Sequence, residues 1–321
     1  MVLLLISCTE DPDEHVPFKP TSTINKLFIV GSQIDDGDLV LYVNGTDTDG
    51  VPLAVTDFTQ GLNVVVGDEP TTLTYTDGDG SVSVNAVADG DQILSLTLLS
   101  DYSGSIDESQ FTVLSSIHNL ILDALPAIYE IQVINFSDDP HLRLDWTESN
   151  ADPTSADYQA IRNAVEVDDT FRRNGTALYD SVGFSLYREL GDLTDGLIER
   201  CRPASMLIAF SDGVENWSTT YTDLTILQLT ITQNNVLPIM LGNEASNLET
   251  LTALAGEQGA VVQMSNATDI ETQITNWKDS LSGMVSVRIS STVPYDTNTV
   301  TLRMDSVQDV VFDPSTGGVC P

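Results

Sequence analysis

Two patterns of hydrophobic positions divide the chain. From Lys26 to about Asp89, apolar residues alternate with polar ones or form short runs, separated by turns rich in Asp and Gly. A period of two is typical of strands that bury one face. The strands expected here contain Leu39 to Val43, Leu62 to Val66, Leu73 with Tyr75, and Val82, Val84 with Ala86. The alternation returns after residue 284, at Val285, Val287 and Ile289 and at Val300, Leu302 and Met304. We therefore expect one β-sandwich whose strands come from both chain ends.

The turns of this part carry acids and glycines. Asp77-Gly78-Asp79-Gly80 lies between two alternating runs and predicts a β-hairpin. The segment 44–50 invites comparison with the EF-hand calcium loop, which needs an acid two places before Asp47 and a closing Glu. Gly45 and Thr56 occupy those places, so the template fails. Ordinary hairpin turns are the preferred interpretation, and a weak calcium site is the minority alternative.

Between residues 91 and 283, short apolar runs alternate with segments of helical periodicity. The expected strands are Ile93 to Leu99, Tyr129 to Phe136, Met206 to Phe210, Val236 to Leu241 and Ala260 to Met264. The expected helices carry the stripes Val113, Leu114, Ile117, Leu120; Leu178, Val182, Leu186; Leu248, Leu251, Ala255; and Ile270, Ile274, Trp277, Leu281. This rhythm predicts a mostly parallel sheet covered on both faces by helices whose apolar stripes are buried.

Composition narrows the class of protein. The 321 residues include 48 acidic and 12 basic side chains, giving a net charge of −36, and 41% are hydrophobic. So few cations cannot neutralise a phosphate backbone or an anionic membrane surface, which argues against nucleic-acid binding. The length and apolar fraction predict a folded protein of two domains. No run of 18 apolar residues occurs, so no transmembrane helix is predicted.

Three polar segments stand where strands end or helices begin. Asp101-Tyr102-Ser103-Gly104-Ser105 follows the first strand of the α/β part, Asn174-Gly175-Thr176 opens a helix, and Phe210-Ser211-Asp212-Gly213 ends a later strand. Open α/β folds bind ligands at the carboxyl edge of the sheet. Hydroxyl and carboxylate oxygens are ligands that a hard cation such as Mg²⁺ prefers.

These segments, in this order, resemble the metal-ion-dependent adhesion site of the von Willebrand factor A family, which begins with DxSxS. The resemblance covers residues 91–283. It implies that Mg²⁺ (or Mn²⁺) is held by Ser103 and Ser105 and, directly or through water, by Thr176, with Asp101 and Asp212 largely in an outer shell. Such an ion keeps positive character and takes an Asp or Glu carboxylate of a protein partner. Ser100 departs from the family, which usually has an apolar residue there, and should affect packing only.

The N-terminus points to the cell envelope. Leu5-Ile6-Ser7-Cys8 resembles the lipobox of bacterial lipoproteins, which implies a lipid anchor on Cys8, in the outer membrane if the host is Gram-negative. Residues 9–25 are rich in Thr, Ser, Pro and acids, as expected of a tether. An ordinary buried strand that contains Cys8 is the alternative. Cys201 and Cys320 could pair, but no spacing settles it.

The expected organisation follows the chain. It comprises a truncated lipoprotein signal (1–8), a tether (9–25), the first part of the sandwich (26–90), the α/β domain (91–283), the second part of the sandwich (284–313) and a tail (314–321). The segments 39–43, 47–52 and 57–58 also resemble a β-module that precedes this domain in bacterial surface proteins.

An enzyme is not expected. His15 lies in the tether, His118 beside the stripe of the first helix, and His141 in a turn. Without a G-x-S-x-G elbow or a P-loop, the sequence offers no assembled nucleophile and base. Two hypotheses remain: a cation-dependent adhesion or protein-binding module on a lipid-anchored envelope protein, or a structural component of an envelope assembly whose metal only stabilises the domain.

Overall fold

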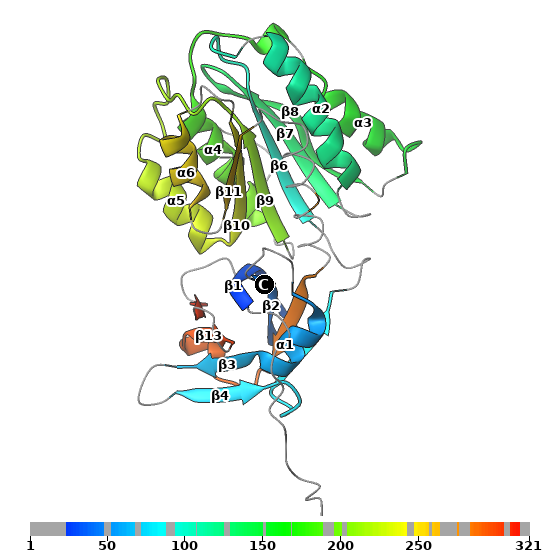
Figure 1. The fold of residues 1–321 in the computed structure, drawn as a ribbon, viewed down its shortest axis with the longest axis vertical. Coiled ribbons are helices and arrows are strands. Elements are labelled where there is room, and N and C mark those ends of the chain that lie inside the picture. The colour runs from blue at the N-terminus through cyan, green and yellow to red at the C-terminus, as the bar shows by residue number, and fades with distance from the viewer. Residues whose placement is uncertain are drawn as a thin grey trace, which may run out of the picture.

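The fold is seen in a computed structural model (Figure 1), which describes residues 24–47, 53–67, 72–87, 94–106, 108–124, 129–149, 152–167, 169–188, 196–200, 204–242, 247–256, 259–263, 275, 283–304 and 309–314. These residues form a mixed α/β part with a six-stranded sheet, and a second part with two four-stranded sheets. Cys8, Cys201, Cys320 and His15 lie outside the described residues, as does the predicted helix over 270–281 except for residue 275.

The six-stranded sheet has the order β11-β10-β9-β6-β7-β8. Its strands are β6 (Leu94–Asp101), β7 (Tyr129–Phe136), β8 (Pro140–Ser149), β9 (Ala204–Phe210), β10 (Val236–Gly242) and β11 (Ala260–Gln263). All neighbours are parallel except β7 and β8, which are antiparallel. Every residue of β6 and β7 is buried, as expected of central strands covered on both faces. The predicted mostly parallel sheet is confirmed.

Helices cover both faces of this sheet. One face packs against α2 (Glu108–Ala124) and α3 (Ala156–Ala164), and the other against α4 (Leu178–Tyr187), α5 (Leu224–Gln233) and α6 (Leu248–Ala255) (Figure 1). Short 3-10 turns are η1 (Asp169–Phe171), η2 (Leu197–Glu199) and η3 (Tyr295–Thr297). The sequence prediction contained α2, α4 and α6 but not α3, α5 or β8.

Two predicted core positions are exposed. Val113 of α2 is 39% exposed and Leu248 of α6 is 38% exposed. In α2 the predicted Leu114 and Ile117 are buried, together with residues that the prediction did not include: Phe111, His118, Ile121 and Leu122. A helix with apolar residues on more than one side allows several stripes of similar periodicity, and packing against the sheet selects one of them.

The second part is a β-sandwich built from both chain ends. One sheet has the order β1-β2-β12-β5 and the other β14-β13-β3-β4. Their strands are β1 (Ile24–Asp35), β2 (Asp38–Asp47), β3 (Asn63–Val66), β4 (Leu73–Thr76), β5 (Val82–Ala86), β12 (Val285–Ile289), β13 (Val300–Arg303) and β14 (Val310–Phe312). The late strand β12 lies between β2 and β5, and β13 pairs with β3. Phe58, on the short helix α1 (Val55–Gly61), is fully buried in their common core.

The predicted hairpin at residues 77–80 is wrong. β4 pairs with β3 in one sheet, while β5 pairs with β12 in the other, so this turn carries the chain between the sheets. The Asp79 carboxylate accepts hydrogen bonds from the backbone N–H groups of Thr76 and Ser81, which lowers the pKa of Asp79. The Asp-Gly pattern thus predicted the turn but could not show which strands it joins.

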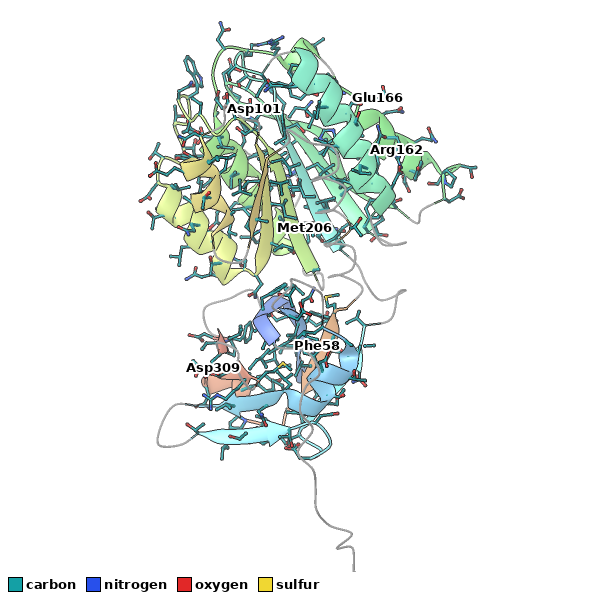
Figure 2. The ribbon with its side chains drawn as sticks, viewed as in Figure 1. Phe58, Asp101, Arg162, Glu166, Met206 and Asp309 are labelled. Carbon is teal, nitrogen blue, oxygen red and sulfur yellow. The ribbon has the colours of Figure 1, made fainter. Side chains whose placement is uncertain are left out.

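The two parts meet at the amino edge of the six-stranded sheet. Leu39 and Leu41 of β2 face the sandwich core, whereas Val40 and Tyr42 belong to the core of the α/β part. Where the chain passes between the parts, the N–H of Val87 donates to the carbonyl of Met284 at 3.2 Å. Figure 2 shows Met206 at this end of the α/β part and Asp101 at the far end, away from the sandwich. The carboxyl edge of the sheet is therefore left uncovered by the sandwich.

Candidate metal site

The predicted site residues come from three loops at this carboxyl edge. Asp101 is the last residue of β6, with Ser103 and Ser105 in the loop after it. Thr176 lies two residues before α4, and Asp212 lies two residues after β9. Because β6 and β9 are adjacent and parallel, with Ser100 opposite Phe210, their following loops emerge side by side.

The Asp101 carboxylate joins two of these loops. Its side chain is fully buried. Oδ1 accepts from the backbone N–H of Ser103 at 2.8 Å, and Oδ2 accepts from the hydroxyl of Ser211 at 2.7 Å. The Ser211 hydroxyl in turn accepts from the N–H of Gly213 at 3.0 Å. Asp101 therefore fixes the loops that carry Ser103 and Asp212 relative to each other.

Two serine hydroxyls form one edge of the site. The Ser103 and Ser105 Oγ atoms are 3.0 Å apart, and Ser103 is buried while Ser105 is exposed. Adjacent ligands in an octahedron lie √2 times the metal–ligand distance apart, which is about 3 Å for Mg²⁺ at ~2.0–2.1 Å. The spacing of the two hydroxyls therefore fits two neighbouring positions around such an ion.

The loop of Thr176 is tied to its neighbours through the backbone. Thr176 is buried, its N–H donates to Oδ1 of Asn216 at 2.9 Å, and its carbonyl accepts from the N–H of Asn216 at 3.2 Å. The N–H of Ala177 donates to the carbonyl of Ser137, after β7, at 2.6 Å. On the other side, Ser103 forms an isolated β-bridge with Arg173. These bonds hold Thr176 between the loops that follow β6, β7 and β9.

Asp212 is held by its own loop. It is 5% exposed, its Oδ1 accepts from the N–H of Val214 at 2.9 Å, and its carbonyl accepts from the N–H of Asn247 at 2.6 Å. Gly213 next to it has φ of +71°, and a Cβ there would lie 2.6 Å from the carbonyl oxygen of Asn247. The turn therefore requires glycine at this position.

The two charged side chains among the predicted site residues, Asp101 and Asp212, are both acidic. Burial raises the pKa of Asp101 to about 7, with a further contribution from the negative charge of Asp212, although hydrogen bonds from Ser103 and Ser211 oppose the rise. A cation would favour the ionised form. Within the described residues no group of three or more His, Cys, Asp or Glu side chains is placed to hold a metal. The donors here are hydroxyls with two carboxylates, which suits a hard ion such as Mg²⁺.

A histidine beneath the site is part of its support. His118 is buried, with Nε2 3.1 Å from the Ser100 hydroxyl and Nδ1 3.1 Å from the Val165 carbonyl. A carbonyl only accepts, so Nδ1 carries the hydrogen and Nε2 accepts from Ser100. Ser100, the departure from the family pattern, thus has a specific partner on α2. Burial lowers the pKa of His118 to about 4, so this ring is neutral at pH 7.

Other residues were misplaced or missed by the sequence analysis. His141 lies in β8, opposite Asn135 of β7, and not in a turn. Its ring is 5.4 Å from that of Phe171. Ser211 and Asn216, which hold Asp101 and Thr176, were not predicted as functional. Ser211 directly precedes a predicted ligand, but Asn216 is recognised only once the loop after β9 is folded.

Comparison with known proteins yields likeness of fold alone. No family model and no curated protein matches the chain. Similar solved structures include a von Willebrand factor type A protein from Catenulispora acidiphila, at 11% identity and TM-score 0.45, over 83% of this chain and 52% of that one. Another is VWA2, an ArnB paralog from Sulfolobus acidocaldarius, at 16% identity and TM-score 0.43, over 90% and 72%. A third is an aerotolerance-related membrane protein from Bacteroides fragilis, at 13% and 0.43, over 58% and 98%. The chain spans about half the length of the first.

Replacing His118 with Gln should change how stability depends on pH. A histidine whose pKa is lowered by folding contributes stability above its unfolded pKa of about 6.5, and this is lost as pH falls toward 4. Between those values the wild type should lose up to about 3 kcal/mol more unfolding free energy than the variant. Urea unfolding at several pH values measures both proteins, and Asp101, present in each, cancels in the difference. Parallel profiles would contradict the assignment.

Proposed function

We propose that this chain is a divalent-cation-dependent protein-binding or adhesion module of the cell envelope. Mg²⁺ (or Mn²⁺) would be held by the hydroxyls of Ser103, Ser105 and Thr176, with Asp101 and Asp212 orienting them from an outer shell. When bound, the ion would supply a positive centre that takes an Asp or Glu carboxylate of a partner protein.

The convergence of hydroxyl and carboxylate donors from three loops carries this proposal. Asp101 holds the backbone of Ser103 and the side chain of Ser211 at once, and the two serine hydroxyls lie 3.0 Å apart. The buried Asp101 carboxylate is costly without a cation, because burial and the nearby charge of Asp212 both disfavour its ionised form. The geometry and the charge therefore favour the same kind of ligand.

The position of the site supports binding to a partner. It lies at the end of the α/β part opposite the sandwich (Figure 2), and Gly104 and Ser105 of its loop are exposed to solvent. Neutral hydroxyls as ligands leave the ion most of its charge, which favours an anionic ligand from outside the chain. A carboxylate on a partner matches that requirement.

A structural component of an envelope assembly is the second candidate. The observation that favours it is the burial of Asp101, because an ion beside it would also relieve a destabilising charge within the folded domain. In that case the ion would need no external ligand. The two candidates differ in whether a carboxylate from another protein binds at the site.

Millimolar Mg²⁺ or Mn²⁺ should raise the melting temperature. An ion that binds only the folded state stabilises it by about 2.7 kcal/mol at a hundredfold excess over Kd. Asp101→Ala should abolish the shift, because it removes the group that organises both loops. Asp309→Ala is a matched control, since Asp309 pairs with Arg303 at 2.7 Å in the sandwich and the shift should persist there. No shift in the wild type, together with no heat of binding by calorimetry, would refute the metal site.

A pull-down from envelope extract should separate the two candidate functions. With Mg²⁺ the immobilised chain should retain a partner that EDTA releases and that Asp101→Ala does not retain, because the partner's carboxylate binds the ion itself. The same partner retained equally with and without EDTA would favour the structural candidate.

Cys8 is proposed to carry a lipid anchor, on the four-residue resemblance at its position. No described helix is long and apolar enough to span a bilayer. Expressed with a complete export signal, the native protein should fractionate with membranes, and Cys8→Ser should release it into the soluble fraction, because acyl chains supply the attachment. Equal retention of the two proteins in the membrane fraction would contradict the anchor.

A further inference from the structure

A cavity of about 540 Å³ opens beside the proposed metal site. Three loops line it: the loop after β7 through Asp138, the loop before α4 through Arg172 and Arg173, and the loop after β9 through Asn216 and Trp217. The last two of these loops also carry Thr176 and Asp212. The cavity is therefore built on the same framework as the site but uses different side chains.

Backbone contacts place the cavity next to the serine loop. The N–H of Arg173 donates to the carbonyl of Tyr102 at 3.3 Å, and Arg173 forms the bridge with Ser103. A Cβ on Gly104 would lie 3.3 Å from Oδ1 of Asn174. A peptide segment with one side chain at the metal site would thus have its neighbouring residues over the cavity.

The cavity carries two adjacent cations in a protein of charge −36. Arg172 and Arg173 are both exposed. Their guanidinium groups donate to main-chain carbonyls: Arg173 Nη1 to Thr170 at 3.1 Å and to Arg172 at 2.8 Å, and Arg172 Nη2 to Ile106 at 2.5 Å. Bonds to carbonyls orient a guanidinium without neutralising it. These arginines therefore offer positive charge at the edge of the site.

Trp217 adds an exposed aromatic surface to the cavity. It is 56% exposed, and its ring lies against Gly175, where a Cβ would come within 2.8 Å of the indole. The loop is held by Glu215, which accepts from the N–H groups of Trp217 and Ser218. Asp180 of α4 likewise accepts from three consecutive N–H groups, those of Thr219, Thr220 and Tyr221. A tryptophan fixed in this way contacts a partner at little entropic cost.

We propose that this cavity binds a second acidic side chain of the segment whose first carboxylate binds the metal, together with an adjoining apolar residue that packs on Trp217. Arg172 and Arg173 supply the charge that selects the second carboxylate. This assignment rests on the proposed function and defines the partner further: a protein segment with two nearby carboxylates and an apolar residue beside the second.

Synthetic octapeptides test the assignment on the full chain in Mg²⁺. One set carries a single Asp in a Gly-Ser background, with Leu at the place where it stands in the second set. The second set carries another Asp beside that Leu, one to four places after the first Asp. A third set repeats the second with Ser in place of Leu. The best diacidic peptide should bind about tenfold more tightly than the monoacidic one, which is the advantage expected of one oriented charge pair. This advantage should shrink as salt rises.

Variants of the cavity assign the advantage to its residues. Arg172→Gln with Arg173→Gln should bring the diacidic peptide to the affinity of the monoacidic one. Arg162→Gln is a control for the loss of a distant positive charge, because Arg162 pairs with Asp123 on the α2–α3 side and Figure 2 shows it away from Asp101. In this control the tenfold advantage should persist. Trp217→Ala should weaken only peptides that carry Leu, and its exposure makes a loss of folding unexpected.

The outcomes separate this assignment from the proposed function. Calorimetry with Mg²⁺ alone, and monoacidic peptide binding with and without EDTA, test the metal site; failure of either overturns the proposed function and this assignment with it. Metal-dependent monoacidic binding with no gain from the second Asp overturns this assignment alone. A diacidic advantage that survives in the double arginine variant also overturns it.

Discussion

The hydrogen bonds of the Asp101 carboxylate hold together the loops at the carboxyl edge of the six-stranded sheet. Asp101 lies where β6 ends, fully buried, and it bonds the backbone of Ser103 and the hydroxyl of Ser211 together. The first bond shapes the serine loop, and the second fixes the loop that leads to Asp212. From Asp212 the chain continues to Asn216, whose side chain and backbone hold Thr176. One buried acid thus sets the positions of donors that lie far apart in sequence. Burial also raises the free energy of the ionised form of Asp101, and a cation nearby would lower it.

The sandwich leaves this edge free by packing elsewhere. β2 is buried on both faces, with Leu41 in the sandwich core and Tyr42 in the core of the α/β part. That contact occupies the amino edge of the six-stranded sheet, where Leu94 of β6 and Ala204 of β9 are buried. Because the chain enters and leaves the α/β part side by side, joined by the bond from Val87 to Met284, the inserted part is held at its base. The loop after β6 at the opposite end contributes Tyr102 and Ile106 to the core of the α/β part, so the loops of the site depend on that core and not on the sandwich.

Sequence reasoning succeeded where one local pattern determines the structure and failed where partners far along the chain decide it. Alternation at Val285, Val287 and Ile289 was sufficient to predict a strand, and apolar runs were sufficient for β6, β7 and β9. The turn at Asp79 was also visible, but its strands belong to different sheets, a choice made by pairing with β3 and β12. α5 was not predicted: apolar and polar residues alternate along 227–232, whereas the buried residues Leu227, Thr230 and Ile231 follow helical spacing. At the site, ligand types could be predicted from a motif, but the supporting bonds of Asn216 and His118 could not, since each joins residues more than 15 positions apart.

The large negative charge of the chain does not exclude the proposed anionic partner, because most of that charge lies far enough from the site to be screened by salt. At physiological salt the Debye length is ~8 Å, so most of the acidic side chains behind the net charge of −36 act weakly on a ligand at the carboxyl edge. On the proposed function, such a ligand would meet a cation held by hydroxyls, with Arg172 and Arg173 beside it and Asp138 as the acidic residue of the cavity lining. A surface that is acidic elsewhere then works against segments that reach the chain at any other place, because they gain no contact to offset the repulsion. Because basic residues are scarce in this chain, Arg172 and Arg173 would give an acidic segment bound at the proposed metal site a preferred direction in which to extend along the described loops.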